Sequence, residues 1–385
     1  MLPGYRERVP ALPDDAIRRT PADVLTVGAC GEADLLQRIL ARVPAADDAL
    51  LGAGDDAAVL TAGDGRVVIT TDLMIEGPDF RSAWSTARDV ARKACASNLA
   101  DVAAMGAAPT AITVALALPS STPVSWVEEL ADGFADALAD MAPGCGVVGG
   151  DLSTSEQLTI AITAFGDLRG GEPVRRSGAK AGDVLALSGP AGRSGAGLSL
   201  LYSLARDARG EALAEGIQAL RSRGDAVRSV VDWHLAPTID ASLGLAARAA
   251  GATAMMDVSD GLLLDASRLA RASGVRVEVE TSSLAVDIAA VEAALRAALP
   301  GVGAAELHAR AVDLVVVGGE DHGLLATFPA GTTLPEGFRV IGRVHPNDDR
   351  PVPPVLVDGA GRAARGWDPY AWDFSASGSS TGLTS

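Results

Sequence analysis

Leu51-Gly-Ala-Gly-Asp-Asp-Ala-Ala-Val-Leu60 places two glycines directly before a pair of carboxylates. Glycines in such a loop often let backbone N–H groups wrap a phosphate, as in a P-loop. Asp55 and Asp56 would repel a phosphate, so we interpret Gly52 and Gly54 as residues of a tight turn. Such a turn would let Asp56 present its carboxylate to a ligand, for which a hard cation is the natural kind of partner. Asp55 is either an indirect partner of that site or a turn residue.

Size and charge limit the function classes around this stretch. The chain has 385 residues, 48% of them hydrophobic, which predicts two domains with sizeable cores. Asp and Glu number 49 against 32 Lys and Arg, and the net charge of −17 disfavours nucleic acid and anionic membranes as partners. The three cysteines lack CxxC spacing, which argues against a disulfide framework or a zinc site. With neither a signal peptide nor a membrane-spanning run, we expect a soluble, cytoplasmic protein.

Periodicity and chain breakers predict two α/β domains that meet near residue 172. We expect a poorly ordered leader over 1–28, an N-terminal domain over 29–171, a C-terminal domain over 172–374 and a disordered polar tail over 375–385. The predicted helices cover 32–43, 87–105, 124–141, 194–206, 239–250 and a segment from Gly261; the predicted strands cover 66–71, 110–118, 158–165, 184–189, 252–258, 275–280, 323–328 and 338–344.

Acidic residues recur where apolar strands are predicted to stop. They are Asp72 after VVITT, Asp151 after GVVGG, Asp257 and Asp260 in MMDVSDG, and Glu320 and Asp321 in VVVGGED. Loops at strand ends are where α/β folds gather their ligand groups. A single Asp beside a glycine is often only a turn residue or a helix N-cap, and that alternative stays open for Asp55 and Asp260.

Asp101 differs because it lies inside a predicted Ala-rich helix. There Lys93, Ser97, Asn98 and Asp101 share one face by three- and four-residue spacing. Clustered carboxylates need a compensating cation, and oxygen ligands without nearby His or Cys favour Mg²⁺, Mn²⁺ or Ca²⁺ over zinc. The four histidines are far apart and show no metal-binding spacing, so we expect none of them to be catalytic.

Seven motifs in order resemble those of the thiamine-monophosphate kinase family. They are GAGDDAAVL, VITTDLMIEG, KACASNLADVAAMGAAP, VVGGDLS, RRSGAKAGD, MDVSDGL and GGED, within residues 27 to 374. The GDD and GGD motifs are shared with the wider superfamily of aminoimidazole ribonucleotide and selenophosphate synthetases, so they indicate the fold. The third, fifth and sixth motifs indicate the kinase.

The resemblance implies a two-domain α/β (α+β) synthetase-like fold whose N-terminal domain forms a homodimer through a β-barrel-like interface. It implies transfer of phosphate from ATP to thiamine monophosphate with several Mg²⁺ ions, and no general base. The implied metal ligands are Asp56, Thr70, Thr71, Asp72, Asp101, Asp151, Asp257 and Asp260. Gly150, Asp151, Arg176 and Ser259 are the implied ATP contacts, and Asp79, Glu320 and Trp372 the implied acceptor contacts.

The acceptor contacts are where this sequence departs from the family pattern. EGPDF stands here where the family has EGxHF, so Asp79 replaces a histidine, and AWDF replaces a GWDHF-like ending. Without the resemblance, Arg176 is equally well a solvated arginine of a basic junction loop.

Two other classes of function remain as alternatives. One is another ATP-using synthetase of the superfamily, of the selenophosphate or aminoimidazole ribonucleotide type. A selenophosphate synthetase needs a reactive cysteine or selenocysteine near its N-terminus, and Cys30 is the only candidate for it. A non-catalytic metal- or nucleotide-binding protein is the other, and the acids on both predicted domains argue against it.

Overall fold

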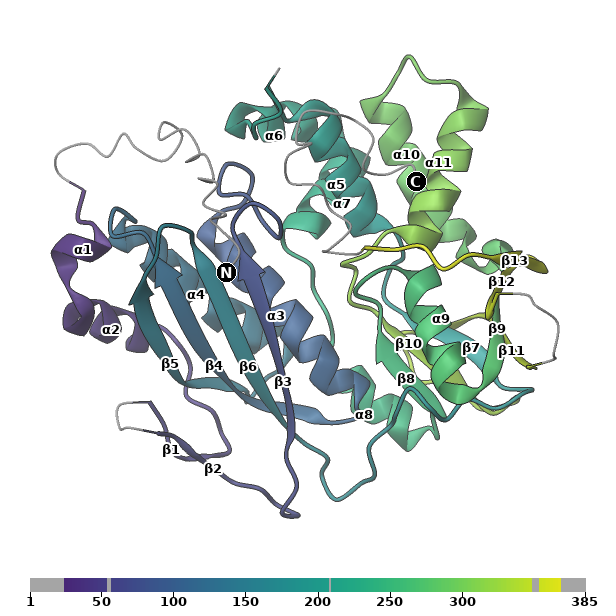
Figure 1. The fold of residues 1–385 in the computed structure, drawn as a ribbon, viewed down its shortest axis with the longest axis horizontal. Helices are drawn as coiled ribbons and strands as arrows, with labels where there is room; N and C mark the ends of the chain where they lie inside the picture. The colour runs from purple at the N-terminus through teal and green to yellow at the C-terminus, as the bar shows by residue number, and fades with distance from the viewer. Residues whose placement is uncertain (1–23, 54–56, 208, 348–352, 368–385) are drawn as a thin grey trace, which may run out of the picture.

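The computed structural model describes residues 24–53, 57–207, 209–347 and 353–367, which fold around a four-stranded and a seven-stranded sheet, with a small two-stranded sheet beside them (Figure 1). The elements of the first half are α1 (Val27–Cys30), α2 (Glu32–Leu40), β1 (Ala49–Leu51), β2 (Val59–Leu60), β3 (Val68–Ile75), α3 (Ala87–Ala104), β4 (Ala108–Leu118), α4 (Val124–Met141), β5 (Gly146–Thr154) and β6 (Thr159–Asp167). The opening stretch of the sequence therefore connects β1 to β2, which pair antiparallel.

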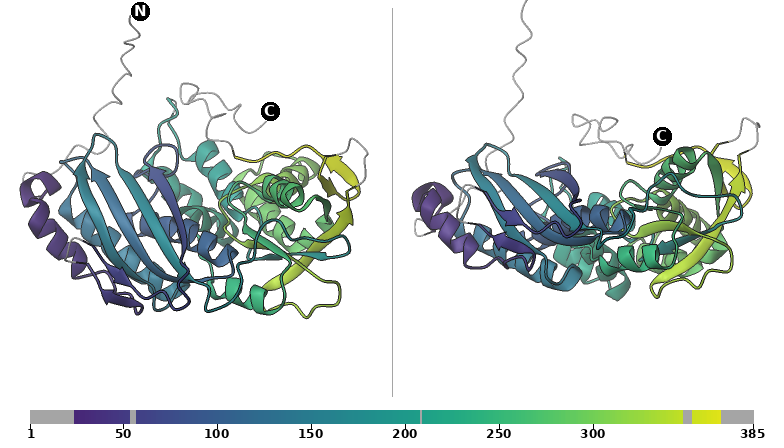
Figure 2. Two further views of the ribbon diagram at one scale, coloured as in Figure 1. Left: turned by 60° about the horizontal axis from the view of Figure 1, so that its bottom comes forward. Right: turned by 90° about the horizontal axis from the view of Figure 1, so that it is seen from below.

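A four-stranded sheet in the order β3-β6-β4-β5 organises this half. β6 runs antiparallel to both neighbours, while β4 and β5 are parallel and joined by the crossover helix α4. Helices α3 and α4 cover one face of the sheet (Figures 1 and 2). Side chains such as Leu99, Ile112, Leu138 and Ile160, all 1% exposed or less, fill the space between them.

The second half contains β7 (Val184–Ser188), α5 (Arg193–Leu204), α6 (Ala214–Arg221), α7 (Asp225–Leu235), α8 (Ser242–Ala249), β8 (Ala254–Asp257), α9 (Leu262–Ser273), β9 (Val275–Val279), η1 (Thr281–Leu284), α10 (Ala285–Ala298), α11 (Ala304–Val317), β10 (Leu324–Phe328), β11 (Phe338–Pro346), β12 (Val355–Val357) and β13 (Ala360–Arg362). Its seven strands form one sheet in the order β13-β12-β9-β11-β7-β10-β8. Most of its pairings are antiparallel, which makes the whole a mixed α/β fold of two parts.

Helix α3 is the element that joins the two halves. A reciprocal capping box starts it, because Asp89 N donates to Thr86 Oγ1 at 3.2 Å and Thr86 N donates to Asp89 Oδ2 at 2.9 Å. The chain leaves it through Gly106 at φ 71°, a left-handed conformation that glycine adopts without strain. Gly244 of α8 lies so close that a Cβ there would be 2.0 Å from the carbonyl oxygen of Ala103, so the halves are in tight contact.

The predicted long elements are confirmed, and the errors concern where the acids lie on them. The predicted helices at 87–105 and 124–141 correspond to α3 and α4 within one residue. Asp72 and Asp151, expected at strand ends, lie inside β3 and β5, because each strand continues for three more residues in ladder pairing. Glu320 and Asp321 do not follow a strand: the apolar run before them is the last turn of α11.

The outward face of the edge strand β3 is apolar and open. Val67, just before the strand, and Ile69 and Leu73 within it are 52, 62 and 54% exposed beside Thr71, while alternate residues of the strand face α3. Both large sheets are open, so a closed barrel is not seen within the part of one chain that the structure describes.

Two sequence predictions stay untested. One is the domain boundary near residue 172. The other is the disorder expected of the leader over 1–28 and of the tail over 375–385, because nearly all of the leader and the whole tail lie outside the described residues. No helix in the described ranges is long and apolar enough to cross a membrane.

Candidate functional site

The polar stripe of α3 lies against the inward face of β3. Ser97 Oγ donates a short hydrogen bond to Asp72 Oδ2, and the backbone N–H of Asp72 donates to Asn98 Oδ1 at 3.2 Å. One helical turn further on, Thr70 Oγ1 donates to Asp101 Oδ2 at 2.7 Å. The helical spacing that selected this stripe in the sequence therefore places two predicted metal ligands, Asp72 and Asp101, on facing elements.

The second half adds Asp257 to this group. It is the last residue of β8 and only 3% exposed. Burial, followed by the negative charges of Asp257 and Asp72, raises the pKa of Asp101 to about 6, and the hydrogen bond from Thr70 opposes this shift. The Asp101 carboxyl therefore lies within reach of the charges of Asp72, on the facing strand, and of Asp257, from the other sheet, and a bound cation would relieve that repulsion.

His322 is a buried neighbour of Asp257 that the sequence did not reveal. Its Nδ1 lies 3.6 Å from Asp257 Oδ2, just beyond hydrogen-bond distance, and that buried nitrogen has no hydrogen-bond partner within the described chain. Burial alone would lower the pKa of His322, but the neighbouring Asp257 carboxylate raises it above its ordinary value. Because the two residues are 65 positions apart and share no motif, spacing gave no signal for this pair.

Lys93 marks the other end of the stripe and reaches the second half directly. Its Nζ lies 2.8 Å from Glu320 Oε1 and donates to the backbone carbonyl of Asp79 at 3.0 Å. Burial would raise the pKa of Glu320, but the Lys93 ammonium opposes it through its charge and its hydrogen bond, and the pKa is lowered. The predicted acceptor residues Asp79 and Glu320 therefore lie together, two turns of α3 from Asp101.

The carboxylate of Asp79 points back into its own turn. Asp79 Oδ2 accepts a hydrogen bond from the backbone N–H of Ile75 at 2.7 Å, and burial raises the pKa of this carboxyl. Since the backbone N–H of Asp79 also donates to the Ile75 carbonyl at 3.1 Å, the residue closes the turn after β3.

Three consecutive residues connect these parts. Glu320 and His322 have φ of 64° and 55°, a left-handed backbone that non-glycine residues adopt at a cost of about 1–3 kcal/mol and that is concentrated at functional sites. Between them Asp321 accepts from the N–H groups of Gly192, at 2.5 Å, and Ser194, at 2.8 Å, at the start of α5. The first backbone N–H groups of α5 are thus capped by a carboxylate of the protein itself.

Some predicted ligands lie away from this cluster. Thr71 is on the opposite face of β3, where its hydroxyl donates to the carbonyl oxygen of Ile162. Asp260 accepts from Arg268 Nη1 at 2.5 Å, and its backbone N–H donates to Asp265. The Asp260 carboxylate is therefore already paired with a cation.

The central GGD motif occupies the far edge of the first sheet. Asp72, Ile162, Val114 and Gly150 form one row across β3, β6, β4 and β5, so Gly150 is about 14 Å from Asp72 at ordinary strand spacing. Gly150 has no room for a side chain, because a Cβ would lie 2.0 Å from the Val114 carbonyl oxygen. Asp151 beside it is exposed and accepts from Ser153 Oγ at 2.9 Å.

The remaining predicted ATP contacts are on the second half. Arg176 is exposed, and its carbonyl accepts from Ser273 Oγ at 2.8 Å. Ser259 lies two residues after Asp257, and its carbonyl accepts from the backbone N–H of Glu320 at 2.7 Å. Asp56 and Trp372 lie outside the described residues, although Trp367 within them donates its backbone N–H to the Asp260 carbonyl at 2.9 Å.

The acidic residues suit a metal ion whose remaining coordination positions are filled by the phosphates of a bound ligand. Within residues 24–53, 57–207, 209–347 and 353–367, no three Asp, Glu, His or Cys side chains form a ready-made metal site. Mg²⁺ typically takes one or two carboxylates and fills its other positions with water and substrate phosphate. The facing Asp72, Asp101 and Asp257 suit that partial ligand set.

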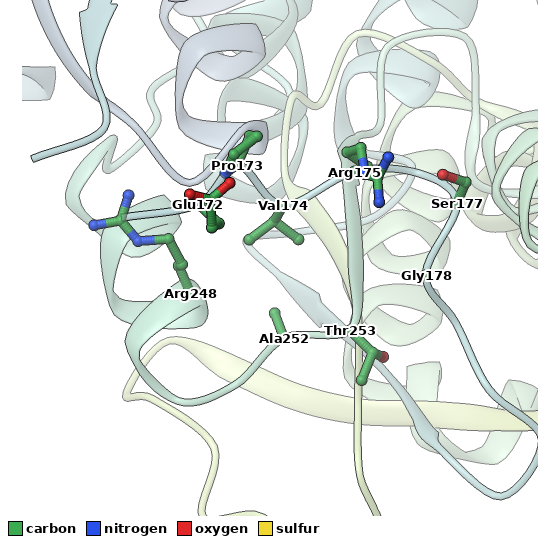
Figure 3. A pocket seen from close by; sticks show the side chains of 9 residues that line it. All are labelled: Glu172, Pro173, Val174, Arg175, Ser177, Gly178, Arg248, Ala252 and Thr253. Carbon is green, nitrogen blue, oxygen red and sulfur yellow. The ribbon is translucent and has the colours of Figure 1, made fainter. Parts of the chain in front are cut away.

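A cavity of about 340 Å³ lies beside the Arg176 loop (Figure 3). Arg248 and Arg175 stand apart along its lining with Val174 between them, and Ala252 and Thr253 lie below in this view. Arg248 Nη1 donates to the carbonyl oxygens of Gly106 and Leu168 at 2.6 Å each, so this arginine mainly fixes the junction of the halves. Asp72, Asp101 and Asp257 do not line this cavity. We therefore place the candidate site at the polar side chains along α3 rather than at the cavity.

Comparison with known proteins agrees with this arrangement. Residues 54–168 match the N-terminal domain of AIR synthase related proteins and residues 180–344 match their C-terminal domain. A thiamine-monophosphate kinase of Mycobacterium tuberculosis is 42% identical over 336 residues, which are 87% of this chain and 90% of that protein. The chain belongs to the thiamine-monophosphate kinase family.

Solved structures of this family share the fold. A thiamine-monophosphate kinase from Stenotrophomonas maltophilia is 34% identical and superposes with a TM-score of 0.64, covering 86% of this chain and 96% of its own. AaThiL complexed with AMPPCP and TMP is 27% identical with a TM-score of 0.62, covering 90% of this chain and 99% of its own. The family's fold therefore extends over both halves described above.

Proposed function

We propose that this member of the thiamine-monophosphate kinase family transfers the terminal phosphate of ATP to thiamine monophosphate in one direct, in-line step, giving thiamine diphosphate. The family assignment supplies the reaction, and a relative of known structure binds AMPPCP and TMP together. The observation that carries the site is the convergence of Asp72, Asp101 and Asp257 at the junction of the halves.

The chemistry suits a site without a general base. The acceptor is a phosphate monoester, largely dianionic at neutral pH because its second pKa is about 6, so its oxygen needs no deprotonation. The obstacle is repulsion between the dianion and the nucleotide phosphates, and alignment with charge neutralisation overcomes it. Bound Mg²⁺ would supply that neutralisation. The chain's own part is to hold carboxylates on rigid elements at fixed separations.

We assign the roles as follows. Thr70, Asp72, Asp101 and Asp257 form the central metal-binding group. The family resemblance adds Asp56, Thr71, Asp151 and Asp260 as further metal ligands, of which Thr71 faces away from the central group and Asp151 lies at the far edge of the first sheet. Gly150, Asp151, Arg176 and Ser259 contact ATP. Glu320, Asp79 and Trp372 contact the thiamine part of the acceptor. Asp260 has to exchange its ion pair with Arg268 for a metal ion before it can act as a ligand.

The open apolar face of β3 supports a homodimer. Val67, Ile69 and Leu73 expose apolar area on one face of an edge strand, which proteins commonly cover by association. We propose that two copies pair through this sheet and that together they build the barrel-like interface implied by the family resemblance.

Product analysis tests the reaction. Purified protein is incubated with ATP, Mg²⁺ and thiamine monophosphate, and thiamine diphosphate is quantified by chromatography. Thiamine replaces the monophosphate in a parallel reaction and should be a poor acceptor, because its neutral hydroxyl needs a base. Equal rates with both acceptors would contradict the base-free mechanism. If no thiamine diphosphate forms, and ATP is consumed only when the substrate of another enzyme of the superfamily is added, the proposed reaction is wrong and the protein catalyses that other reaction.

A further inference from the structure

We propose that Lys93 is a positioning residue for the acceptor, which acts by holding Glu320 and the backbone of Asp79 in place. This inference rests on the proposed acceptor roles of those two residues. It assigns to α3 a second task beyond facing the metal-binding acids.

The ammonium of Lys93 has two fixed contacts on opposite sides. It lies 2.8 Å from Glu320 Oε1, in the second half of the molecule, and 3.0 Å from the carbonyl oxygen of Asp79, in the first. The Lys93 side chain is 5% exposed, whereas that of Glu320 is 33% exposed. Lys93 is therefore shielded behind the carboxylate, and Glu320 is the member of the pair that a ligand can reach.

The rest of the Glu320 environment explains why a positioning group is needed. The residue has a left-handed backbone, and its other oxygen, Oε2, is 3.5 Å from His234 Nδ1. His234 is buried, and burial lowers its pKa to about 3, so it is a neutral neighbour at physiological pH. Lys93 is thus the charged group that fixes the direction of the Glu320 carboxylate.

Composition argues that an ammonium is specifically required. Of the 32 basic residues of the chain only two are lysines, Lys93 and Lys180; all others are arginines. An ammonium is a compact charge that can direct protons to a carboxylate and a carbonyl on different sides, whereas the planar guanidinium of arginine favours side-by-side acceptors. A chain that otherwise uses arginine keeps lysine at a buried point between its halves.

Steady-state kinetics on four variants tests the role. Lys93→Met removes the charge, Lys93→Arg keeps it with the wrong shape, Glu320→Gln changes the partner, and Lys93→Met/Glu320→Gln closes the cycle. Lys180→Met is the matched control, because it removes the other lysine from an exposed position. KM for thiamine monophosphate and for ATP, kcat and the melting temperature are measured for each.

We expect Lys93→Met and Lys93→Arg to raise the acceptor KM about ten-fold or more, while the ATP KM changes less than about three-fold. Because Lys93 acts through Glu320, the double variant should be no worse than the poorer single variant in kcat/KM for the acceptor. Lys180→Met should match the wild type. Calorimetric binding of thiamine monophosphate to Glu320→Gln checks the same subsite if Lys93→Met fails to fold.

Several results would overturn the inference. If the Lys93 variants raise the KM for ATP as much as the KM for thiamine monophosphate, Lys93 has no specific role at the acceptor. If Lys93→Met lowers the melting temperature and the double variant restores both the melting temperature and full activity, the Lys93–Glu320 ion pair has only a structural role. If Glu320→Gln binds thiamine monophosphate as tightly as the wild type, Glu320 does not contact the acceptor, and Lys93 cannot act through it. An inactive wild-type protein would instead contradict the proposed function.

Discussion

Buried His234 makes the stability of this protein depend on pH in a predictable direction. It lies in the last turn of α7, 5% exposed, with Nδ1 2.9 Å from Ser194 Oγ. Burial, and then the nearby Lys93 ammonium, lower its pKa to about 3, although Glu320 opposes the shift. Between about pH 6.5 and pH 3 the unfolded chain binds a proton at this residue that the folded chain does not. Stability is therefore lost as the pH falls through that window.

The magnitude follows from the two pKa values. At about pH 5 the unfolded state gains RT ln(1 + 10^1.5), or about 2 kcal/mol, from protonating one imidazole of pKa about 6.5, and at about pH 7.5 it gains almost nothing. A native pKa anywhere below about 4 gives nearly the same figure, because the folded state is then unprotonated at pH 5. His234→Gln should thus lose about 2 kcal/mol less than the wild type on going from pH 7.5 to pH 5.

Urea unfolding at the two pH values, in the presence of a chelator, measures this difference. The fixed cost of the substitution cancels because each protein is compared with itself. Ser194→Ala is the matched control: it removes the hydrogen-bond partner but leaves the imidazole, so it should keep the wild-type pH dependence. Parallel pH dependence in His234→Gln and the wild type would show that the folded protein protonates His234, and the reasoning from burial would be wrong.

Three further outcomes test the site and the fold. Asp72→Asn and Asp257→Asn should each lower kcat/KM at least about 100-fold with an unchanged circular dichroism spectrum, and near-normal turnover in either would contradict the metal assignment. Gly150→Ala should destabilise the β4–β5 pairing and lower the melting temperature, because its Cβ would lie 2.0 Å from the Val114 carbonyl oxygen; an unchanged melting temperature would refute that steric argument. Ile69→Glu should convert a dimer to a monomer in light scattering if the β3 face is the interface.

The sequence predicted the elements that periodicity and chain breakers determine locally. Helix α3 was predicted because the segment is Ala-rich, its polar residues repeat at helical spacing, and Gly106 ends it. The Thr86–Asp89 capping box that starts the helix was found only in the structure. Its contact with β3 followed in part, since Asp101 and Asp72 were both expected at one site. The strand-end rule misplaced Asp72 and Asp151, because hydrophobic alternation does not reveal how far a ladder continues beyond a polar residue.

The contacts between the halves were beyond the reach of the sequence. Lys93 with Glu320 and His322 with Asp257 join residues 227 and 65 positions apart, and no motif spacing encodes either pair. His322 and His234 were set aside because isolated histidines usually have structural roles. What makes them relevant is burial next to carboxylates, which only the packing of α7, β8 and β10 creates.

The position of α3 explains why the site requires both halves. One face of this helix carries Lys93, Ser97, Asn98 and Asp101, and each has a partner on β3, on the turn after it or on the second half. A stripe of four polar residues would be costly to bury against the first sheet alone, because Lys93 would have no carboxylate. The second half contributes that carboxylate through Glu320 and the third acid through Asp257. The same packing that buries Lys93 therefore brings the proposed acceptor-binding end and the proposed metal-binding end of the stripe onto one rigid helix, so their separation is set by helical rise rather than by a loop.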